Sequence, residues 1–490
     1  MRSFFNLSGV ATSVPGLLLA TLLLAPLGAE PVPAGNIGLP VLGKVRARAA
    51  NEIVASSWSI GGETIDRDFT VYRHYRQYLG PLGAKAIRLQ AGWAKCEREP
   101  GVYAWSWLDD IVNDAIAQGV QPWLELSYGN PVHPDGGDTG LGGGFPSSPE
   151  ALAAWDRWAK ALVERYKDRV HLWEIWNEPD INPTGRAPVA GYLDLYVRTA
   201  AMIRALQPEG RIIALSLANN LDYADQFLAG LQAQGRLDLV DAITIHGYPS
   251  NPDDTTNIDR LRAVIVKYGR AIEVRQGETG APSRPQKQFA LRNISFTENL
   301  QAKWNLRRLL AHRAKDVACN LFTMSDMHYN HYHRESGDAL RMNYKGLLGT
   351  NPDQTISHAK TAYYAAQNVF AIFDDTLQRI PVYPFTDTSL RGLALSGYQR
   401  AADGAQVVAL WFNDAPPAEA NGVTRVNVTL TEGRFSEPVL VDLLTGLVHA
   451  LPVDGWTHGQ DGITFVGLPV YDSPVLIMEK SMLRIDPANR

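Results

Sequence analysis

Short apolar runs alternate with amphipathic stretches between residues 52 and 375. Eight of these runs have the length and the β-branched or aromatic content of strands, and each precedes a segment with helical periodicity. The predicted strands are residues 54–58, 86–90, 122–127, 171–176, 212–217, 242–246, 272–276 and 320–324. Strands that alternate with helices build parallel sheets, and eight such units over about 320 residues favour a closed (β/α)8 TIM barrel over a doubly wound sheet.

The helical segments lie between these strands and after the last of them. The clearest helix start is Ser148-Pro149-Glu150, where Ser148 has the place of an N-cap and Pro149 that of the first helical residue. The predicted helices are residues 69–79, 108–118, 149–166, 191–206, 222–234, 258–268, 300–314 and 358–370.

The pattern changes after Asp375, where no helical periodicity remains. Short β-rich runs separated by Gly, Asp and Pro occupy residues 390–398, 407–411, 423–430, 439–443 and 475–478. These runs predict a β-sandwich accessory domain over residues 376–490, behind a catalytic barrel over residues 52–375. Residues 30–51 form an N-terminal segment that could join the β-domain.

The N-terminus has the composition of a signal peptide. Arg2 precedes an apolar run over residues 14–24, and the small residues Gly28-Ala29 offer a cleavage site. We therefore expect residues 1–29 to be removed from a secreted or periplasmic protein. A permanent membrane anchor is the alternative, although the run is short for a span. No other segment is apolar enough to cross a bilayer, so no integral membrane segment is expected after cleavage.

Charge and cysteine content exclude some classes of protein and of binding partner. The formal net charge is −5 without a basic block, which disfavours a nucleic-acid partner. The only cysteines are Cys96 and Cys319, too few for a disulfide scaffold, and their places at opposite ends of barrel strands argue against a bridge. The glycine-rich stretch 135–144 lacks the Gly-Lys-Ser/Thr ending of a phosphate loop, and no cofactor is expected. The sequence leaves the oligomeric state open.

Two glutamates follow barrel strands at the end where such barrels hold their active sites. Glu178 lies in Trp-Asn-Glu-Pro after the fourth predicted strand, and Glu278 lies in Gly-Glu-Thr-Gly after the seventh. Cleavage of a glycosidic bond requires one protonated carboxyl group and one ionised carboxylate facing it. Glu125, Glu174 and Glu273 are rivals, but they lie within strands and are expected to fill polar layers or to pair with interior arginines.

These motifs resemble those of the clan A glycoside hydrolases. The likeness to family 39 rests on further residues over roughly 52–375: Arg88, the turn 101–105, the strand 123–127, His246-Gly247-Tyr248-Pro249 and Ser325-Asp326.

The resemblance implies roles for individual residues. Glu178 would be the acid/base and Glu278 the nucleophile of a double displacement with net retention. Asn177 would hydrogen-bond the sugar 2-hydroxyl group, and Arg88 would keep Glu278 ionised. His246 or Tyr248 would orient Glu278 or bind the sugar. The alternatives are an interior ion pair for Arg88 and packing at the barrel rim for His246 and Tyr248.

The end of the eighth strand departs from the clan pattern. Clan members often place a Trp there as a floor beneath the sugar, whereas this chain has Phe322-Thr323-Met324-Ser325-Asp326. The following cluster, residues 328–333, contains three histidines but matches no zinc motif. It predicts an aromatic and polar loop at the sugar cleft, with a plain surface loop as the alternative, and no metal site. Asp326 and His328 are therefore expected to bind substrate, and Trp93, Trp176 and Tyr128 are candidates for stacking on sugar rings.

The sequence thus predicts a secreted retaining glycosidase that acts on an oligo- or polysaccharide. A carbohydrate-binding barrel without turnover and a transglycosylase are the alternatives. The identity of the sugar and the choice between exo and endo cleavage stay open, with a weak preference for a β-linked substrate.

Overall fold

The computed structural model describes residues 37–182, 187–329 and 341–487. The predicted signal peptide lies outside these residues. Among the helices that the structure describes, none is both long and apolar enough to cross a membrane.

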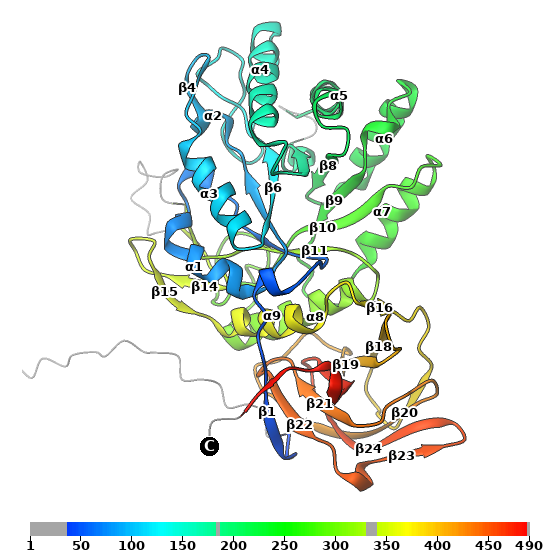
Figure 1. Ribbon diagram of the computed structural model, residues 1–490. Helices are drawn as coiled ribbons and strands as arrows, with labels where there is room; N and C mark the ends of the chain where they lie inside the picture. Colours follow the sequence, from blue (N-terminus) through cyan, green and yellow to red (C-terminus); the bar gives the residue numbers. More distant parts are fainter. Residues whose placement is uncertain (1–36, 183–186, 330–340, 488–490) are drawn as a thin grey trace, which may run out of the picture. The chain divides into compact units, whose positions relative to one another are not determined.

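Eight parallel strands close into a barrel, which confirms the predicted fold class (Figure 1). They are β2 (Trp58–Gly61), β3 (Ala86–Gln90), β6 (Gln121–Leu126), β7 (Leu172–Ile175), β8 (Arg211–Leu217), β9 (Ala242–His246), β10 (Glu273–Thr279) and β11 (Cys319–Leu321). Pairing of β11 with β2 closes the ring through the Cα partners Cys319 and Trp58. Every residue of β3 and of β9 is buried, as expected where a parallel sheet is covered on its outer face and filled on its inner face.

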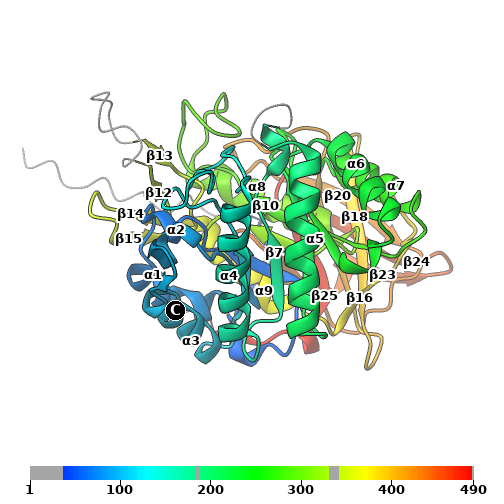
Figure 2. The same cartoon turned by 90° about the horizontal axis from the view of Figure 1, so that it is seen from above.

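Helices follow the strands on the outside of the barrel, and Figure 2 shows α4 and α5 side by side there. The helices are α1 (Tyr72–Leu82), α3 (Ser106–Ala117), α4 (Pro149–Tyr166), α5 (Val189–Leu206), α6 (Leu221–Ala233), α7 (Thr256–Val266), α8 (Glu298–Arg313) and α9 (Thr361–Ile372). The predicted N-cap of α4 is confirmed, because the Ser148 hydroxyl accepts a 3.2 Å hydrogen bond from the Ala151 amide.

The first strand lies later in the chain than the sequence predicted. It was expected at residues 54–58, but β2 begins at Trp58 and Val54 is 89% exposed. The prediction was wrong because Ser59 and Gly61 have weak strand propensity, while the apolar residues before Trp58 suggested a strand. Trp58 is held by its indole, which donates a 2.6 Å hydrogen bond to the Phe373 carbonyl at the end of α9.

The C-terminal strands form two antiparallel sheets. The larger sheet consists of β16 (Leu377–Arg379), β18 (Leu393–Arg400), β19 (Gln406–Phe412), β25 (Val475–Glu479), β21 (Pro438–Asp442), β22 (Leu447–Ala450), β1 (Val41–Val45) and β26 (Ile485–Asp486). The smaller sheet consists of β17 (Phe385–Asp387), β20 (Thr424–Leu430), β24 (Gly462–Val470) and β23 (Trp456–Gly459). Figure 1 shows β1, from the start of the described chain, beside β22.

Short elements complete the loops at the barrel rim. They are α2 (Trp93–Cys96) and the strand pairs β4 (Glu97–Glu99) with β5 (Val102–Tyr103), β12 (Met327–His328) with β13 (Met342–Asn343), and β14 (Leu348–Thr350) with β15 (Ile356–Ala359). Cys96 and Cys319 are both buried free thiols.

Helix α8 is covered on more than one side. Its residues from Asn299 to His312 are all buried, including the charged Lys303 and Arg307. The Lys303 ammonium donates hydrogen bonds to Asp472 Oδ1 at 2.8 Å and to the carbonyls of Ala418 and Ala420 at 2.8 and 3.0 Å. This barrel helix is therefore bonded directly to loops between the C-terminal strands.

Candidate active site

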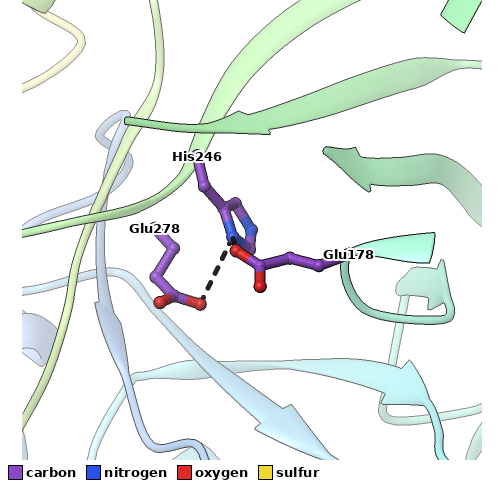
Figure 3. A group of neighbouring side chains, drawn as sticks. All are labelled: Glu178, His246 and Glu278. Carbon is purple, nitrogen blue, oxygen red and sulfur yellow. Dashed lines mark hydrogen bonds and ion pairs between the residues drawn. The ribbon is translucent and has the colours of Figure 1, made fainter. Parts of the chain in front are cut away.

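Glu178 and Glu278 lie at the C-terminal ends of barrel strands. Glu178 follows β7 by three residues, and Glu278 is the second-to-last residue of β10. One carboxylate oxygen of each, together with a ring nitrogen of His246, lie within 4.8 Å of one another. Figure 3 shows the His246 side chain reaching from β9 toward both carboxylates, which face each other. The pairing that the sequence suggested across 100 residues of chain is thus present in space.

The position of Glu178 is set by a sharp bend after β7. Trp176 and Glu178 both have left-handed backbone torsions, with φ of 68° and 46°. The Glu178 amide donates a 3.0 Å hydrogen bond to the Ser216 carbonyl at the end of β8. Asp180 anchors the following turn, because its carboxylate accepts hydrogen bonds from three backbone amides before α6 (residues 218–220) at 2.8, 3.0 and 2.8 Å.

The surroundings of Glu178 favour its protonated form. Burial raises the pKa of its carboxyl group to about 8, and the charge of Asp180 adds to this effect while Arg88 opposes it. A carboxyl group with this pKa is mostly protonated at neutral pH and can donate a proton.

Glu278 has one hydrogen-bond donor and two further polar neighbours. The Tyr248 hydroxyl donates a 2.5 Å hydrogen bond to Glu278 Oε1. Arg88 Nη1 lies 3.7 Å from Glu278 Oε2, and His246 Nδ1 lies 3.4 Å from the same oxygen. Glu278 is thus held in place by Tyr248, with Arg88 and His246 beside its other oxygen.

Arg88 on β3 is the centre of a buried polar network below the two glutamates. Its side chain is fully buried, and its guanidinium donates hydrogen bonds to acceptors at or near the ends of four other strands. The acceptors are Glu63 at 3.0 Å, Glu174 at 2.7 Å, Asn177 at 2.9 Å, Ser216 at 2.7 Å and Glu125. Glu125 and Glu174 thus pair with an interior arginine, as the sequence suggested, whereas Glu273 pairs with Arg211 at the other end of the barrel.

His246 connects the network to the cavity. Its Nδ1 lies 2.7 Å from Glu178 Oε1, and its Nε2 lies 2.9 Å from the Ser216 hydroxyl oxygen. Burial lowers the pKa of this imidazole, although the charge of Glu278 opposes the effect. The ring is therefore neutral at pH 7 and carries one proton between two neighbours, so it can hold or pass a proton at Glu178.

Asn177 is held in one orientation. Its Oδ1 accepts from Arg88, and its Nδ2 donates a 2.9 Å hydrogen bond to the Tyr128 hydroxyl. Both Asn177 and Tyr128 line the cavity, so this amide faces the space where a sugar would lie.

Glu63 is a site residue that the sequence analysis missed. It follows β2, lines the cavity and accepts from Arg88, and burial raises the pKa of its carboxyl group to about 8. The signal was present in Gly61-Gly62-Glu63, but the misplaced first strand hid it. A Cβ atom on Gly61 would lie 2.1 Å from Glu63 Oε2, so a residue with a side chain there would displace this carboxyl group.

A cavity of about 740 Å³ opens above the two glutamates. Its lining includes His246, Tyr248 and Phe322, the last directly after β11. It also includes three cationic side chains: Arg67, Arg341 and Lys345.

Three predicted substrate-binding residues lie away from this cavity. Trp93 is 0% exposed and packs against Trp155 and Trp158, so its ring offers no free face to a sugar. Asp326 and His328 line a separate cavity of about 180 Å³. There Asp326 is paired with Lys360 at 2.6 Å and His328 Nε2 lies 2.8 Å from the Thr350 hydroxyl oxygen.

Trp176 and Tyr128, the other residues predicted to stack on sugar rings, differ in their position relative to the cavity. Trp176 is buried and meets Tyr128 edge-on, and only Tyr128 of the two lines the cavity. Most of the predicted loop at residues 328–333 lies outside the described residues.

The donor atoms of Glu178, His246 and Glu278 are close enough together to approach a cation. Two features disfavour this use of the three side chains. Arg88 lies 3.7 Å from Glu278 and brings a positive charge that would repel a divalent ion. In addition, Glu278 and His246 already have hydrogen-bonding partners in Tyr248 and Ser216.

Comparison with known proteins shows a resemblance to one family over the central part of the chain. Residues 94–276 match the model described as "Glycosyl hydrolases family 39", a region that contains Glu178 and ends two residues before Glu278. A curated relative, an aryl-phospho-beta-D-glucosidase from Bacillus subtilis, is 26% identical over 204 residues. This match covers 37% of the chain and 39% of that protein, so the chain spans well under half of the length of this relative.

Solved structures show the same fold over most of the chain. A family 39 glycoside hydrolase from Bacteroides cellulosilyticus has a TM-score of 0.59 at 18% identity and covers 86% of this chain and 81% of its own. A monomeric beta-xylosidase from Caulobacter crescentus has a TM-score of 0.56 at 18% identity, with 90% and 98% covered. The predicted resemblance to the clan A glycoside hydrolases, and to family 39 in particular, is confirmed.

Proposed function

We propose that this chain, which resembles the clan A glycoside hydrolases and family 39 in particular, is a retaining glycosidase with Glu178 as acid/base and Glu278 as nucleophile. The observation that carries the proposal is the closeness of the two carboxylates, because one oxygen of each lies within 4.8 Å of the other. Retaining enzymes hold these groups about 5–5.5 Å apart, whereas inverting enzymes need about 6.5–9.5 Å to admit a water molecule.

In the first step Glu278 attacks the anomeric carbon while Glu178 protonates the departing glycosidic oxygen. The raised pKa of Glu178 supplies that proton near neutral pH, and the Tyr248 hydroxyl and Arg88 stabilise the attacking carboxylate. In the second step Glu178, now ionised, takes a proton from water, which displaces Glu278 from the sugar.

The remaining residues orient the reactants. Asn177, held by Arg88 and Tyr128, would donate to a sugar hydroxyl group next to the anomeric carbon. His246 would hold the Glu178 carboxyl group and buffer its proton between the two steps. The names of the two relatives, an aryl-phospho-beta-D-glucosidase and a beta-xylosidase, support a β-linked substrate.

Replacement of the nucleophile is the decisive test. Glu278→Ala should lose at least about a thousandfold in kcat, and added azide should restore turnover with formation of a glycosyl azide of inverted configuration. The assay is a panel of aryl glycosides on wild type and variant, with product configuration read by NMR. Undiminished activity in Glu278→Ala would remove this residue from its role.

Export from the cytoplasm is part of the same proposal and rests on the sequence alone. The charged start, the apolar run and the small residues at Gly28-Ala29 support a cleaved leader of 29 residues. N-terminal sequencing of protein recovered from the periplasm or the medium should begin near Glu30, and an intact N-terminus on membrane-bound protein would contradict it.

A further inference from the structure

Lys345 is a buried cation in the wall of the catalytic cavity. Its residue is 2% exposed, and it lies in the turn between β13 and β14. The turn is fixed by the barrel, because the Lys345 carbonyl accepts from the Thr323 amide after β11 and from the Gln301 side chain of α8, both at 3.3 Å. The ammonium therefore has a defined place at the mouth of the barrel.

The ammonium has few partners there. Among the residues that the structure describes, it donates one hydrogen bond, to the Ala290 carbonyl at 3.2 Å, and no carboxylate lies within 4.0 Å of it. Its other neighbours are aromatic rings, with the Tyr248 centroid at 5.1 Å and the Phe289 centroid at 5.9 Å. An ammonium has three donors, so most of its hydrogen-bonding capacity is unused by the protein.

Burial of such a charge is costly where, as among the described residues, no carboxylate pairs with it. The consequence is seen in its acidity: burial lowers the pKa of Lys345 to about 7, and the charge of Glu278 offsets this only in part. The fold thus holds, beside the nucleophile, a cation whose charge would be stabilised by an anion entering the cavity.

The rest of the wall has the same sign. The guanidinium carbon of Arg341 lies 5.1 Å from the centroid of the Phe289 ring, which Lys345 also approaches. Arg67 lines the cavity as well, and its guanidinium lies over the Phe69 ring. Of the carboxyl groups in the lining, those of Glu63 and Glu178 are largely protonated at neutral pH because burial raises their pKa values. The cavity wall therefore carries cationic side chains beside these two carboxyl groups, and Arg67 is itself paired with Asp66 at 3.2 Å.

We propose that Lys345 pairs with an acidic substituent on the sugar that lies beside Glu278, so that the substrate class is an anionic glycoside. This inference rests on the proposed glycosidase function and names its substrate class. The position follows from contact: Lys345 approaches Tyr248, which in turn donates to Glu278. A carboxylate of a uronic acid and a sulfate ester on a neutral sugar offer the same chemistry to an ammonium.

The test compares matched pairs of aryl glycosides. Glucoside with glucuronide and galactoside with galacturonide differ only in a carboxylate at C5, and 6-sulfated glycosides provide the sulfate source. In wild type, at least one acidic member should have a kcat/KM at least tenfold above that of its neutral partner. In Lys345→Met this ratio should fall at least tenfold, chiefly through KM, and turnover of the neutral member should change little. The carboxylate and sulfate pairs tell the two sources apart.

Lys287→Met is the matched control for removal of a positive charge. Lys287 is exposed on the segment that carries Phe289 but does not line the cavity, so the variant should keep the wild-type ratio. An equal loss on acidic and neutral substrates in Lys345→Met would assign Lys345 to positioning of Tyr248 and overturn the inference. A higher kcat/KM of the wild-type protein on every neutral glycoside than on its acidic partner would also overturn the inference.

A binding measurement keeps this inference separate from the proposed function. Thermal unfolding is followed with glucuronate, galacturonate and glucose 6-sulfate and with their neutral parents, in wild type, Lys345→Met and Lys345→Gln. An acid-selective rise in Tm that is present in wild type and lost in both variants supports the acidic subsite even if no glycoside is hydrolysed. The inference of an acidic subsite is overturned if neither the Tm nor the turnover is selective for acidic sugars. If only neutral glycosides are hydrolysed, the proposed glycosidase function is supported and the acidic subsite is contradicted.

Discussion

Two glutamates at equivalent places on one barrel rim have opposite surroundings. Glu178 is desolvated and has an acidic neighbour, Asp180, whereas Glu278 receives a hydroxyl donor and faces a guanidinium. Burial raises the pKa of Glu178 to about 8, which suits the acid of a two-carboxylate site.

The acid role of Glu178 predicts both a leaving-group dependence and a pH dependence. Glu178→Gln should lower kcat/KM by about 10²–10⁴-fold for poor leaving groups and much less for activated aryl glycosides, which need little protonation. Because the protonated form is the active one and its pKa is about 8, wild-type kcat/KM should fall as pH rises through about 8. The measurement is kcat/KM from pH 5 to 10 on substrates with a range of leaving groups.

Glu63 provides the control for this profile, because burial raises its pKa to about 8 as well. Glu63→Gln should retain the alkaline fall, and Glu178→Gln should lose it. The reverse result would assign the alkaline limb to Glu63 and contradict the acid role of Glu178.

At the residue scale, the sequence predicted the site residues that belong to a recognisable motif. It did not predict the position of side chains whose orientation depends on tertiary packing. Glu178, Glu278, Arg88 and Asn177 were all predicted as site residues, and the structure brings them together. Trp93 follows a barrel strand just as a binding residue would, but its indole donates to Glu97 inside a cluster of tryptophans. Local sequence does not say whether a Trp after a strand turns inward or toward the cavity.

At the scale of elements the strand boundaries depended on residue type. β3 and β9 have the predicted bounds because Ile, Leu and Thr mark their whole length. β2, with the sequence Trp-Ser-Ile-Gly, carries little strand signal and was placed four residues too early, which also concealed Glu63. Its burial in the closed ring, rather than its propensity, makes it a strand.

Arg88 on β3 connects several barrel strands through its hydrogen bonds, so its replacement should lower the stability of the whole barrel. Arg88→Met would leave the carboxyl groups of Glu63, Glu125 and Glu174 without their shared cation. We expect a loss of about 3–5 kcal/mol in the free energy of unfolding, measured by urea denaturation. The loss should be larger at pH 8 than at pH 5, because without Arg88 these buried carboxyl groups are tolerated best when protonated.

A surface arginine offers the contrast. Arg165 pairs with Asp109 at 2.6 Å with its side chain 40% exposed, so Arg165→Met should cost only about 0–1 kcal/mol. Equal destabilisation by the two substitutions would show that the interior network contributes no more than an exposed ion pair.

At the scale of the whole described chain, α8 decides how the barrel and the C-terminal sheets are coupled. Its sequence, with Lys303, Arg307 and Arg308 among apolar residues, predicts a surface helix, and periodicity alone could not show that its polar side is also buried. The reason is tertiary: Arg307 donates to the Ala415 carbonyl at 2.9 Å, and Lys303 reaches Asp472, both in loops between C-terminal strands. The described residues accordingly all belong to one compact unit.

This coupling predicts a single cooperative unfolding transition in which the barrel and the β-domain open together. Lys303→Met would remove the partner of Asp472 in a pair whose side chains are 0% and 10% exposed, at a cost of about 3–5 kcal/mol. Hydrogen exchange should show the same fall in opening free energy for peptides of β3 and of β19, whereas Lys315→Met, which removes an exposed pair with Asp259, should change neither. Faster exchange confined to β19 in Lys303→Met would mean that the β-domain opens independently, and the burial of α8 would then not bind the two parts into one folding unit.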